Sequence, residues 1–549
     1  MEKYSWSLRN LQQKCAAFLS IRLKSLGGVP EVLILIILCL SPLLALAGLS
    51  ITEAFRGNTE VLSLITPEGR RISLLVGTVV LGSGVAAAGI LIGTLAASAF
   101  MSINSPWKGS LVSLVFLFAV IPPYIHALSW QALLETVNNV LNWFSLPEIV
   151  LAGWFGSWWI QLMAFTPLAV GLGILGFEAV SPILIEAGRI MRGDLTVFTR
   201  IVLPLAMPMV AAGGAFLFLL SVTDYSVPVL FQKSVYTLEI FAEYSSNGYP
   251  WNAFWLSIPL LLIIFVVLFF SQYPLKKAAM SRFKTNKAWS NPPKWPSYFS
   301  FLQAAACVIV GLVIFVPVLT LILQTGSVGQ MLNSILAAKE EILFSLGISA
   351  VSAAISLIPA VFIAGKITGS KAVSWLGWVA LLLPVSVPPP LVGIGLIAIW
   401  NRTLPVDVYG SSLMPVLASL ARFLPLAVLI MASQMRRIDP LLMEAAKVMP
   451  VSGLSKWTQI KIPLITPGLI ASFCTVFALT MGELGAAIIV VPPGNSTLAI
   501  RIFNLLHYGA GDSVSGLCLF QVIIILFAVL IGALSMRFGQ YCSQERGCS

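Results

Sequence analysis

Charged residues are scarce in this sequence. Only 10% of its 549 residues are Asp, Glu, Lys or Arg, whereas 58% are hydrophobic. Soluble proteins carry roughly 25% charged residues, because their surface must stay in contact with water. So little charge over this length excludes a soluble globular protein and indicates that much of the chain lies in a membrane.

Histidine and cysteine provide no recognisable metal or redox site. The two histidines, His126 and His507, are isolated, with no second ligand at the spacing that metal sites use. Four of the seven cysteines lie in apolar runs and three near the chain ends, so we expect no disulfide. No cluster of His, Asp or Cys indicates a membrane enzyme. The sequence also lacks a Gly-x-x-x-x-Gly-Lys-Ser/Thr segment, which excludes ATP hydrolysis by that route.

Long apolar runs are abundant. A helix needs about 20 residues to cross the ~30 Å hydrocarbon core of a bilayer. Twelve runs reach this length, six before and six after a basic, proline-containing stretch. The predicted spans are residues 31–50, 72–100, 108–131, 148–178, 207–231, 254–273, 302–324, 342–366, 374–400, 412–435, 468–491 and 516–536.

The positive charges lie mostly on one side of these spans. Of the 32 Lys and Arg residues, 24 lie in tails and loops on the side of the N-terminus, and seven lie in the opposite loops. Cytoplasmic loops carry such an excess of positive charge. The sequence therefore predicts a multi-pass inner-membrane protein with both termini in the cytoplasm. The net charge of +11 reflects this topology and does not indicate nucleic-acid binding.

The two sets of six spans repeat one another. Phe165-Thr-Pro-Leu-Ala-Val170 matches Phe423-Leu-Pro-Leu-Ala-Val428 at an offset of 258 residues. A nearly constant offset relates further pairs: Pro182 and Pro440, Glu186 and Glu444, Pro204 and Pro463, Asp224 and Glu483. Because six spans separate equivalent points, the two halves have the same orientation. Such parallel repeats are related by an axis along the membrane normal.

This repeat divides the chain into five segments. They are a cytoplasmic N-terminal segment (1–30), a first six-helix half (31–273), a basic cytoplasmic linker (274–300), a second six-helix half (301–536) and a cytoplasmic C-terminal tail (537–549). The predicted fold is an all-α integral membrane protein with twelve transmembrane helices arranged as two parallel six-helix repeats.

The longest structured cytoplasmic loop of each half follows its fourth span. The first loop is Glu186–Pro204 and the second loop is Glu444–Pro463. Each predicts a short helix, a turn that contains glycine, and a second short helix with an aromatic residue, Phe198 or Trp457. Proline then marks the start of the fifth span, since proline is tolerated in a first helical turn. Each loop is predicted to form a helix–turn–helix at the membrane surface.

These loops resemble the EAA signature of permeases from binding-protein-dependent ABC importers: Glu-Ala-Ala, a downstream glycine and an Ile-x-Leu-Pro close. In that family the loop forms a coupling helix that docks in a groove of the ATPase subunit. A solvated loop duplicated by ancestry is the alternative. Two departures are Gly188 at the third motif position and Pro450 where the family has glycine. The implied coupling residues are Glu186, Ala187, Gly188, Gly193, Phe198, Pro204, Glu444, Ala445, Ala446, Gly453, Trp457 and Pro463.

Ionisable residues inside the spans form a second candidate site. Asp224 and Glu483 occupy equivalent places in the two fifth spans, and Arg422 of the second half is a candidate counter-ion. Such side chains cost about 2.5–3.5 kcal/mol on insertion scales, so they face an interior or a pathway. They form either a lining or gate of a translocation pathway or a static strut. The third spans contain Pro122–Pro123 and Pro388–Pro390, which predict either part of a gate or an ordinary bend.

The fused halves, with Arg-Phe-Leu-Pro at 422–425 and Gly-Glu-Leu-Gly-Ala at 482–486, resemble ferric-iron permeases of type I ABC importers. Thiamine and phosphonate-type permeases are alternatives, and a twelve-span secondary carrier is the rival outside the family. The resemblance implies a transport subunit without catalytic residues or a bound cofactor. Its implied partners are a cytoplasmic ATPase dimer that binds ATP and Mg, a solute-binding protein on the outer face, and membrane lipid.

Overall fold

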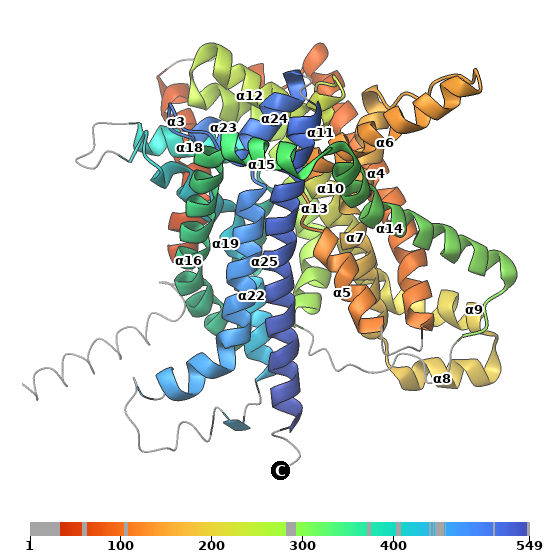
Figure 1. Cartoon of the computed structure of the whole chain (residues 1–549). Coiled ribbons are helices and arrows are strands. Elements are labelled where there is room, and N and C mark those ends of the chain that lie inside the picture. Colours follow the sequence, from red (N-terminus) through yellow and green to blue (C-terminus); the bar gives the residue numbers. More distant parts are fainter. Residues whose placement is uncertain are drawn as a thin grey trace, which may run out of the picture.

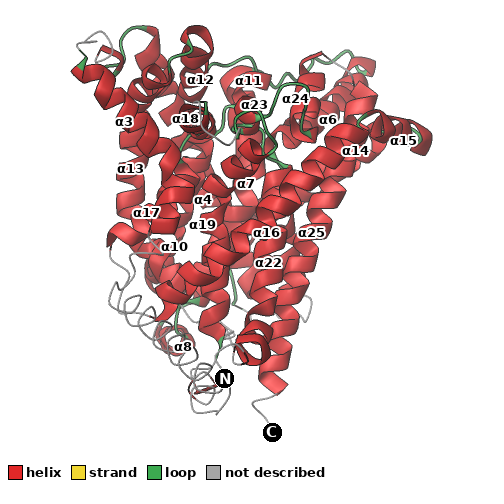
Figure 2. Ribbon diagram, turned by 90° about the vertical axis from the view of Figure 1, so that its left-hand side faces the viewer, coloured by secondary structure: helices red, strands yellow, loops and turns green. Residues whose placement is uncertain are grey.

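The computed structural model describes residues 33–56, 63–103, 108–280, 293–369, 375–401, 408–438, 457–508 and 511–545, with four single positions between 441 and 455. Every secondary-structure element in these ranges is a helix, as Figures 1 and 2 show. Helices satisfy their backbone hydrogen bonds internally, which a chain inside a bilayer requires. The predicted all-α membrane fold is confirmed.

Ten helices within the described ranges are long and apolar enough to cross a bilayer. The first of them includes a π-helical turn, η1 (Ile36–Leu40). The ten are α3 (Ser41–Phe55, with η1), α4 (Arg70–Ser102), α7 (Gly153–Glu178), α10 (Leu203–Thr223), α13 (Pro250–Met280), α14 (Ser297–Gln324), α16 (Lys339–Gly369), α19 (Leu413–Arg437), α22 (Ile462–Met481) and α25 (Gly511–Glu545).

The two remaining predicted spans, the third of each half, are sharply bent. In the first half α5 (Lys108–Phe118) and α6 (Pro123–Trp143) meet at 95°. In the second half α17 (Trp375–Ser386) and α18 (Pro389–Trp400) meet at 105°. Proline lacks a backbone N–H and cannot continue a helix from upstream. Counting each bent pair as one span gives twelve, but these breaks are much larger than an ordinary bend.

The second span of each half packs along the fourth and fifth spans of that half. α4 lies along α7 and α10, and α16 lies along α19 and α22. A Cβ added to Gly93 of α4 would lie 2.7 Å from the backbone carbonyl carbon of Ala169 on α7, so glycine alone permits this approach. On α16 the small residues Ser352 and Ser356 are fully buried. The two halves therefore share one packing scheme.

The first span of each half also packs against the other half. α3 lies against α18, and α14 lies against α4 and α6. A Cβ added to Gly395 of α18 would lie 2.4 Å from the carbonyl oxygen of Pro42 on α3. Gln303 of α14 donates a hydrogen bond of 2.8 Å to the Ser98 hydroxyl of α4. The predicted halves are interlocked, and neither covers its core with its own helices alone.

The short helices lie at two opposite ends of the bundle. Figure 1 shows α8 (Pro182–Met191) at the end where α25 finishes, and α12 (Tyr236–Asn247) and α24 (Leu498–Tyr508) at the opposite end. We name these the α8 end and the α12 end. That the α8 end faces the cytoplasm stays a prediction.

Helices extend into both edges of the predicted linker. α13 continues to Met280 and α14 begins at Ser297, while residues 281–292 lie outside the described residues. Similarly, α25 continues to Glu545, past the predicted span end at residue 536. The apolar run marks where the bilayer ends, whereas the helix continues because its backbone hydrogen bonds do not require apolar side chains. The predicted N-terminal segment, 1–30, lies outside the described residues.

Candidate functional site

The first loop forms the predicted helix–turn–helix at the α8 end. α8 begins at Pro182, whose fixed φ suits the first helical turn. After Met191 the chain turns, and α9 (Asp194–Val197) continues through the π-helical turn η3 (Phe198–Val202) into α10. Pro204 lies in the first turn of α10, where a missing N–H costs no helical hydrogen bond.

Arg189 holds the two short helices together. Its guanidinium lies 3.6 Å from the Glu186 carboxylate on the same helix and 2.9 Å from the Asp194 carboxylate at the start of α9. Asp194 also accepts a hydrogen bond from the backbone N–H of Lys294, just before α14. The predicted residue Glu186 therefore belongs to an ion network that fixes the angle between α8 and α9. Arg189 and Asp194 were not among the predicted residues, although both flank the predicted turn.

Gly188 and Gly193 have different roles in this loop. A Cβ on Gly188 would lie 2.7 Å from Ile201 Cδ1, so the departure from the Glu-Ala-Ala motif lets α8 lie close to η3. Gly193 has an ordinary extended backbone, with φ −65°, and no atom lies close to where its Cβ would stand. Ala187, which precedes Gly188, lies in α8. The close approach at Gly188, rather than the turn itself, requires glycine.

Phe198 is not available as an exposed docking residue. Its ring is buried, with its centroid 5.3 Å from Phe177, 5.6 Å from Trp295 and 5.8 Å from Phe299. The Phe198 ring is therefore not part of the exposed surface of the first loop, and its part in ATPase coupling stays a prediction. A large aromatic side chain can be buried in its own protein's core as well as in a partner's groove. Here α7 and α14 provide that core.

The exposed apolar surface of the first loop lies on α8 instead. Ile190 and Met191 are 87% and 83% exposed, and Ile183 and Leu184 are also exposed. Ile185 alone on this helix is buried. A short helix with uncovered apolar side chains indicates a contact with another surface. The sequence Ile-Leu-Ile-Glu-Ala-Gly-Arg-Ile-Met carried this signal, since it has more apolar positions than one buried face can hold.

The second loop is described only in part. Glu444 is exposed, while Ala445, Ala446 and Gly453 lie outside the described residues. Trp457 begins the π-helical turn η4 (Trp457–Lys461), and the ammonium of Lys461 lies 4.5 Å from the centroid of its ring. Pro463 lies in the first turn of α22, as Pro204 does in α10. Unlike Phe198, Trp457 is 37% exposed.

Asp224 lies at a break in the fifth span of the first half. α10 ends at Thr223, and a short helix, α11 (Ser226–Leu230), follows. One oxygen of the Asp224 carboxylate accepts hydrogen bonds from the Ser226 backbone N–H at 3.1 Å and from its hydroxyl at 2.6 Å. The other oxygen accepts one of 3.0 Å from the Gln161 amide of α7. Asp224 thus caps α11 and links it to the fourth span.

Glu483 occupies the corresponding break in the second half. α22 ends at Met481, and α23 (Ala487–Val490) follows. The Glu483 carboxylate accepts a hydrogen bond of 2.8 Å from the Ala486 backbone N–H and is ion-paired with Arg422 of α19. The predicted counter-ion is therefore in contact with it. Both side chains are largely buried.

The two breaks correct the predicted fifth spans, 207–231 and 468–491. Asp224 and Glu483 lie just beyond the ends of α10 and α22, not within a continuous helix. Each carboxylate accepts backbone N–H groups of the chain that follows, and this local alternative competes with helical hydrogen bonding. The apolar run continues through both breaks, so hydropathy alone gives no sign of them.

The breaks in spans three and five meet between the halves. A Cβ on Gly482, next to Glu483, would lie 2.6 Å from Pro122 Cγ of the other half. The Tyr225 hydroxyl, next to Asp224, donates a hydrogen bond of 3.4 Å to the Gly485 carbonyl. Gly485 is also close to Pro389, at 2.6 Å from an added Cβ. The predicted prolines and the predicted carboxylates thus belong to one inter-half contact.

A second polar contact joins the halves beside this one. The Tyr124 hydroxyl of α6 donates a hydrogen bond of 3.1 Å to the Gln521 side chain of α25. The Gln521 amide in turn donates one of 2.7 Å to the Met481 carbonyl at the end of α22. All three residues are buried. This contact was not predicted, because neither Tyr124 nor Gln521 belongs to a repeated motif.

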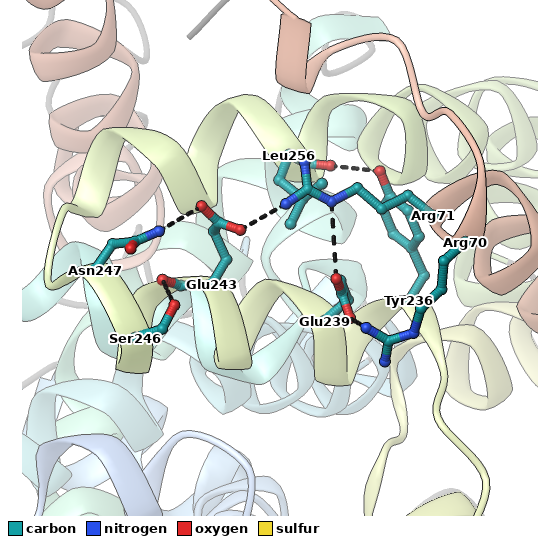
Figure 3. Close-up of polar contacts among 8 residues, drawn as sticks. All are labelled: Arg70, Arg71, Tyr236, Glu239, Glu243, Ser246, Asn247 and Leu256. Atoms are coloured by element: carbon teal, nitrogen blue, oxygen red, sulfur yellow. Dashed lines mark hydrogen bonds and ion pairs between the residues drawn. The ribbon is translucent and has the colours of Figure 1, made fainter. Parts of the chain in front are cut away.

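Ion pairs at the α12 end attach the amphipathic helices to the second spans. Figure 3 shows Arg71 of α4 between Glu239 and Glu243 of α12, at 3.7 Å and 2.7 Å. In the second half the polarity is reversed, since Arg501 of α24 is ion-paired with Glu341 of α16. These contacts fix α12 and α24 beside the broken fifth spans.

Comparison with known proteins gives several relatives, although no protein-family model matches the chain. It is 25% identical over 207 residues to PhnV of Salmonella typhimurium, named as a 2-aminoethylphosphonate transport system permease protein, over 37% of this chain and 77% of the relative. Its relatives are transport permeases. The molybdenum permease ModB of Haemophilus influenzae is 30% identical over 120 residues, 21% of this chain and 52% of the relative. The spermidine/putrescine permease PotC of Escherichia coli is 25% identical over 114 residues, 21% of this chain and 43% of the relative.

These similarities support a transport permease in the membrane. The stretch aligned with PhnV covers 77% of that permease but only 37% of this chain, so this chain is about twice as long. Within the described ranges, no group of three or more His, Cys, Asp or Glu side chains is placed to hold a metal ion.

Proposed function

We propose that this chain is the permease subunit of an ATP-driven ABC importer in the inner membrane. Its relatives are permease proteins of transport systems, and the observation that carries the ATP-driven assignment is the first loop. α8 lies at the α8 end of the bundle and presents apolar side chains that are exposed among the described residues. A separate ATPase dimer, which binds ATP and Mg, docks on this surface and on the second loop.

The proposed coupling follows from how the first loop is joined to the bundle. Arg189 fixes α8 to α9, and η3 continues without interruption into α10. A displacement of α8 by the ATPase is therefore transmitted to α10 as a rigid movement. α10 ends at Thr223, directly before the Asp224 break and its contact with the second half. The first loop and the inter-half contact are thus two ends of one helix.

The inter-half contact is the proposed gate. It closes the space between the halves where Pro122 lies against Gly482 and the Tyr225 side chain lies against Gly485. Asp224 and Glu483 act within it as struts that hold the broken fifth spans to Gln161 and Arg422. The two interpretations of these carboxylates, as a gate and as a strut, are therefore compatible, because each strut sets the position of a gate segment. A solute-binding protein delivers the cargo at the α12 end.

Two cargoes are proposed for testing. The motifs at 422–425 and 482–486 resemble those of ferric-iron permeases, whereas PhnV is named for 2-aminoethylphosphonate. The gate segments described here contain one guanidinium and two carboxylates, all engaged in contacts, so they select neither cargo by charge.

Reconstitution tests the function directly. The chain is placed in proteoliposomes with its candidate ATPase and solute-binding protein, and uptake of ferric iron and 2-aminoethylphosphonate is measured. ATP-dependent uptake of one of them, absent without the ATPase, is the expected result. Uptake driven by an ion gradient without nucleotide or a second subunit would instead establish a secondary carrier.

A further inference from the structure

The helix α15 (Val328–Ala337) belongs neither to the coupling loops nor to the proposed gate. It joins α14 to α16 at the α12 end and has no buried residue. Its ten residues include no charged side chain. The helix is nevertheless well formed, because Ser327 and Gln330 cap its N-terminus reciprocally, with hydrogen bonds of 2.8 Å and 3.3 Å. An ordered helix with an exposed apolar face indicates a contact with another surface.

The side chains of α15 fall on three faces. At about 100° per residue, Val328, Leu332 and Leu336 share one face. They are 76%, 53% and 67% exposed. Gln330 and Asn333 form a second, polar face, which begins about 60° beyond Leu336, and both are exposed. The third face, between these two, packs on α25.

The contact with α25 sets how the other two faces are directed. Met331 packs against Gly516, where an added Cβ would lie 3.6 Å from Met331 Cα. Because α25 lies beside α15, the apolar face and the polar face lie on opposite sides of this contact along the direction of the spans. One of them is directed toward the middle of the bundle, and the other is directed away from it.

The height of α15 is fixed by the two spans that it connects. α14 ends at Gln324 and α16 begins at Lys339, so only three residues precede α15 and one follows it. α15 therefore lies at the level where two spans leave the bilayer. Figure 2 shows it at the edge of the bundle, away from α11, α12 and α23 near the centre. This is the position of the membrane surface rather than of the entrance to a pathway.

We propose that α15 is an interfacial helix that lies on the membrane surface at the α12 end. Its face of Val328, Leu332 and Leu336 is immersed at the boundary of headgroups and acyl chains, and Gln330 and Asn333 contact water. An apolar face of this kind binds by the area it buries. Since α15 carries no Lys or Arg, its binding does not depend on anionic lipid. The immersed helix holds α25 at Gly516, five residues before Gln521, at a constant depth.

Nitroxide labels on neighbouring residues test this proposal. Leu332→Cys and Asn333→Cys variants are labelled in the full-length chain and reconstituted in phosphatidylcholine nanodiscs. The unsubstituted chain, treated with the same label, is the blank for the native cysteines. Power-saturation EPR then measures the collision of each label with oxygen, which concentrates in the bilayer, and with a water-soluble nickel chelate. We expect oxygen to dominate at position 332 and the nickel chelate to dominate at position 333.

Two outcomes would overturn the proposal. If the nickel chelate reaches position 332 as readily as position 333, α15 lies in water. If both reagents are excluded from position 332, this face is covered by protein rather than by lipid. A Leu336→Cys variant repeats the measurement if Leu332→Cys fails to give a monodisperse protein. Adding phosphatidylglycerol should leave the ratio unchanged.

Discussion

Arg422 of α19 and Glu483 after α22 form a buried ion pair that joins the fourth and fifth spans of the second half. The first half makes the same joint without a positive charge, since the Gln161 amide donates to the Asp224 carboxylate at 3.0 Å. In both halves the carboxylate also accepts a backbone N–H of the chain beyond the break. One joint is therefore built twice, with an ion pair in one half and an amide in the other.

Glu483→Gln should destabilise the protein strongly, because it leaves Arg422 charged and buried without its partner. Breaking one partner of a buried ion pair costs about 3–5 kcal/mol. We expect a lower denaturation midpoint and altered transport, while the ATPase still co-purifies, since the substitution lies far from α8. Thermal unfolding in detergent and a pull-down of the ATPase measure the two effects.

The matched control is Asp224→Asn, which removes no ion pair and should reduce stability less than Glu483→Gln does. The double variant Arg422→Gln/Glu483→Gln should regain part of the loss, because no unpaired charge is left. Equal stability of Glu483→Gln and the unsubstituted protein would show that the ion pair does not hold the joint.

Gly482→Ala should force the halves apart at the proposed gate. Its Cβ would lie 2.6 Å from Pro122 Cγ, and neither backbone can move easily. Overpacking of this kind costs about 1–3 kcal/mol. We expect reduced thermal stability and a solute leak that does not require ATP, measured in proteoliposomes. Gly347→Ala on α16, where no atom lies within 4 Å of the added Cβ, should change neither. A tight, stable Gly482→Ala protein would rule out a close inter-half contact at this position.

Ile190→Asp should weaken the association with the ATPase and leave the fold intact. Ile190 is almost fully exposed on α8, so it contributes little to the protein's own core. A charge placed in an apolar docking surface should reduce ATPase recovery several-fold in a pull-down, with an unchanged unfolding temperature. Tyr249→Asp, an exposed apolar position at the α12 end, is the control. Undiminished recovery with Ile190→Asp would place the docking surface elsewhere.

Phe198→Ala and Trp457→Ala should have different effects, although the two aromatic residues occupy equivalent places in the repeat. Phe198 is buried among Phe177, Trp295 and Phe299, so its truncation should cost about 3–5 kcal/mol of stability. Trp457 is partly exposed, so its truncation should reduce stability less and ATPase affinity more. Parallel unfolding and pull-down measurements distinguish them. The reverse pattern would mean that the buried ring, not the exposed one, governs docking.

The spans were predictable because a bilayer imposes a length and a hydrophobicity that can be counted along the chain. The pairing of Arg422 with Glu483 was also anticipated, since a charge inside a membrane needs a partner. The breaks after Thr223 and Met481 were not. Hydropathy continues through them, and the hydrogen bonds from the Ser226 and Ala486 backbone N–H groups to Asp224 and Glu483 depend on local geometry.

The sequence by itself determined that this protein has many spans, that its motifs recur at a nearly constant offset, and that a short helical loop follows the fourth span of the first half. These properties follow from composition and from a repeated order of residues, which do not depend on how the helices pack. Tertiary structure alone decided that Phe198 is buried while Ile190 is exposed, and that α3 and α14 each pack on the opposite half. Burial and contact arise only when distant segments come together, because each apolar side chain packs against whichever neighbouring surface the fold supplies.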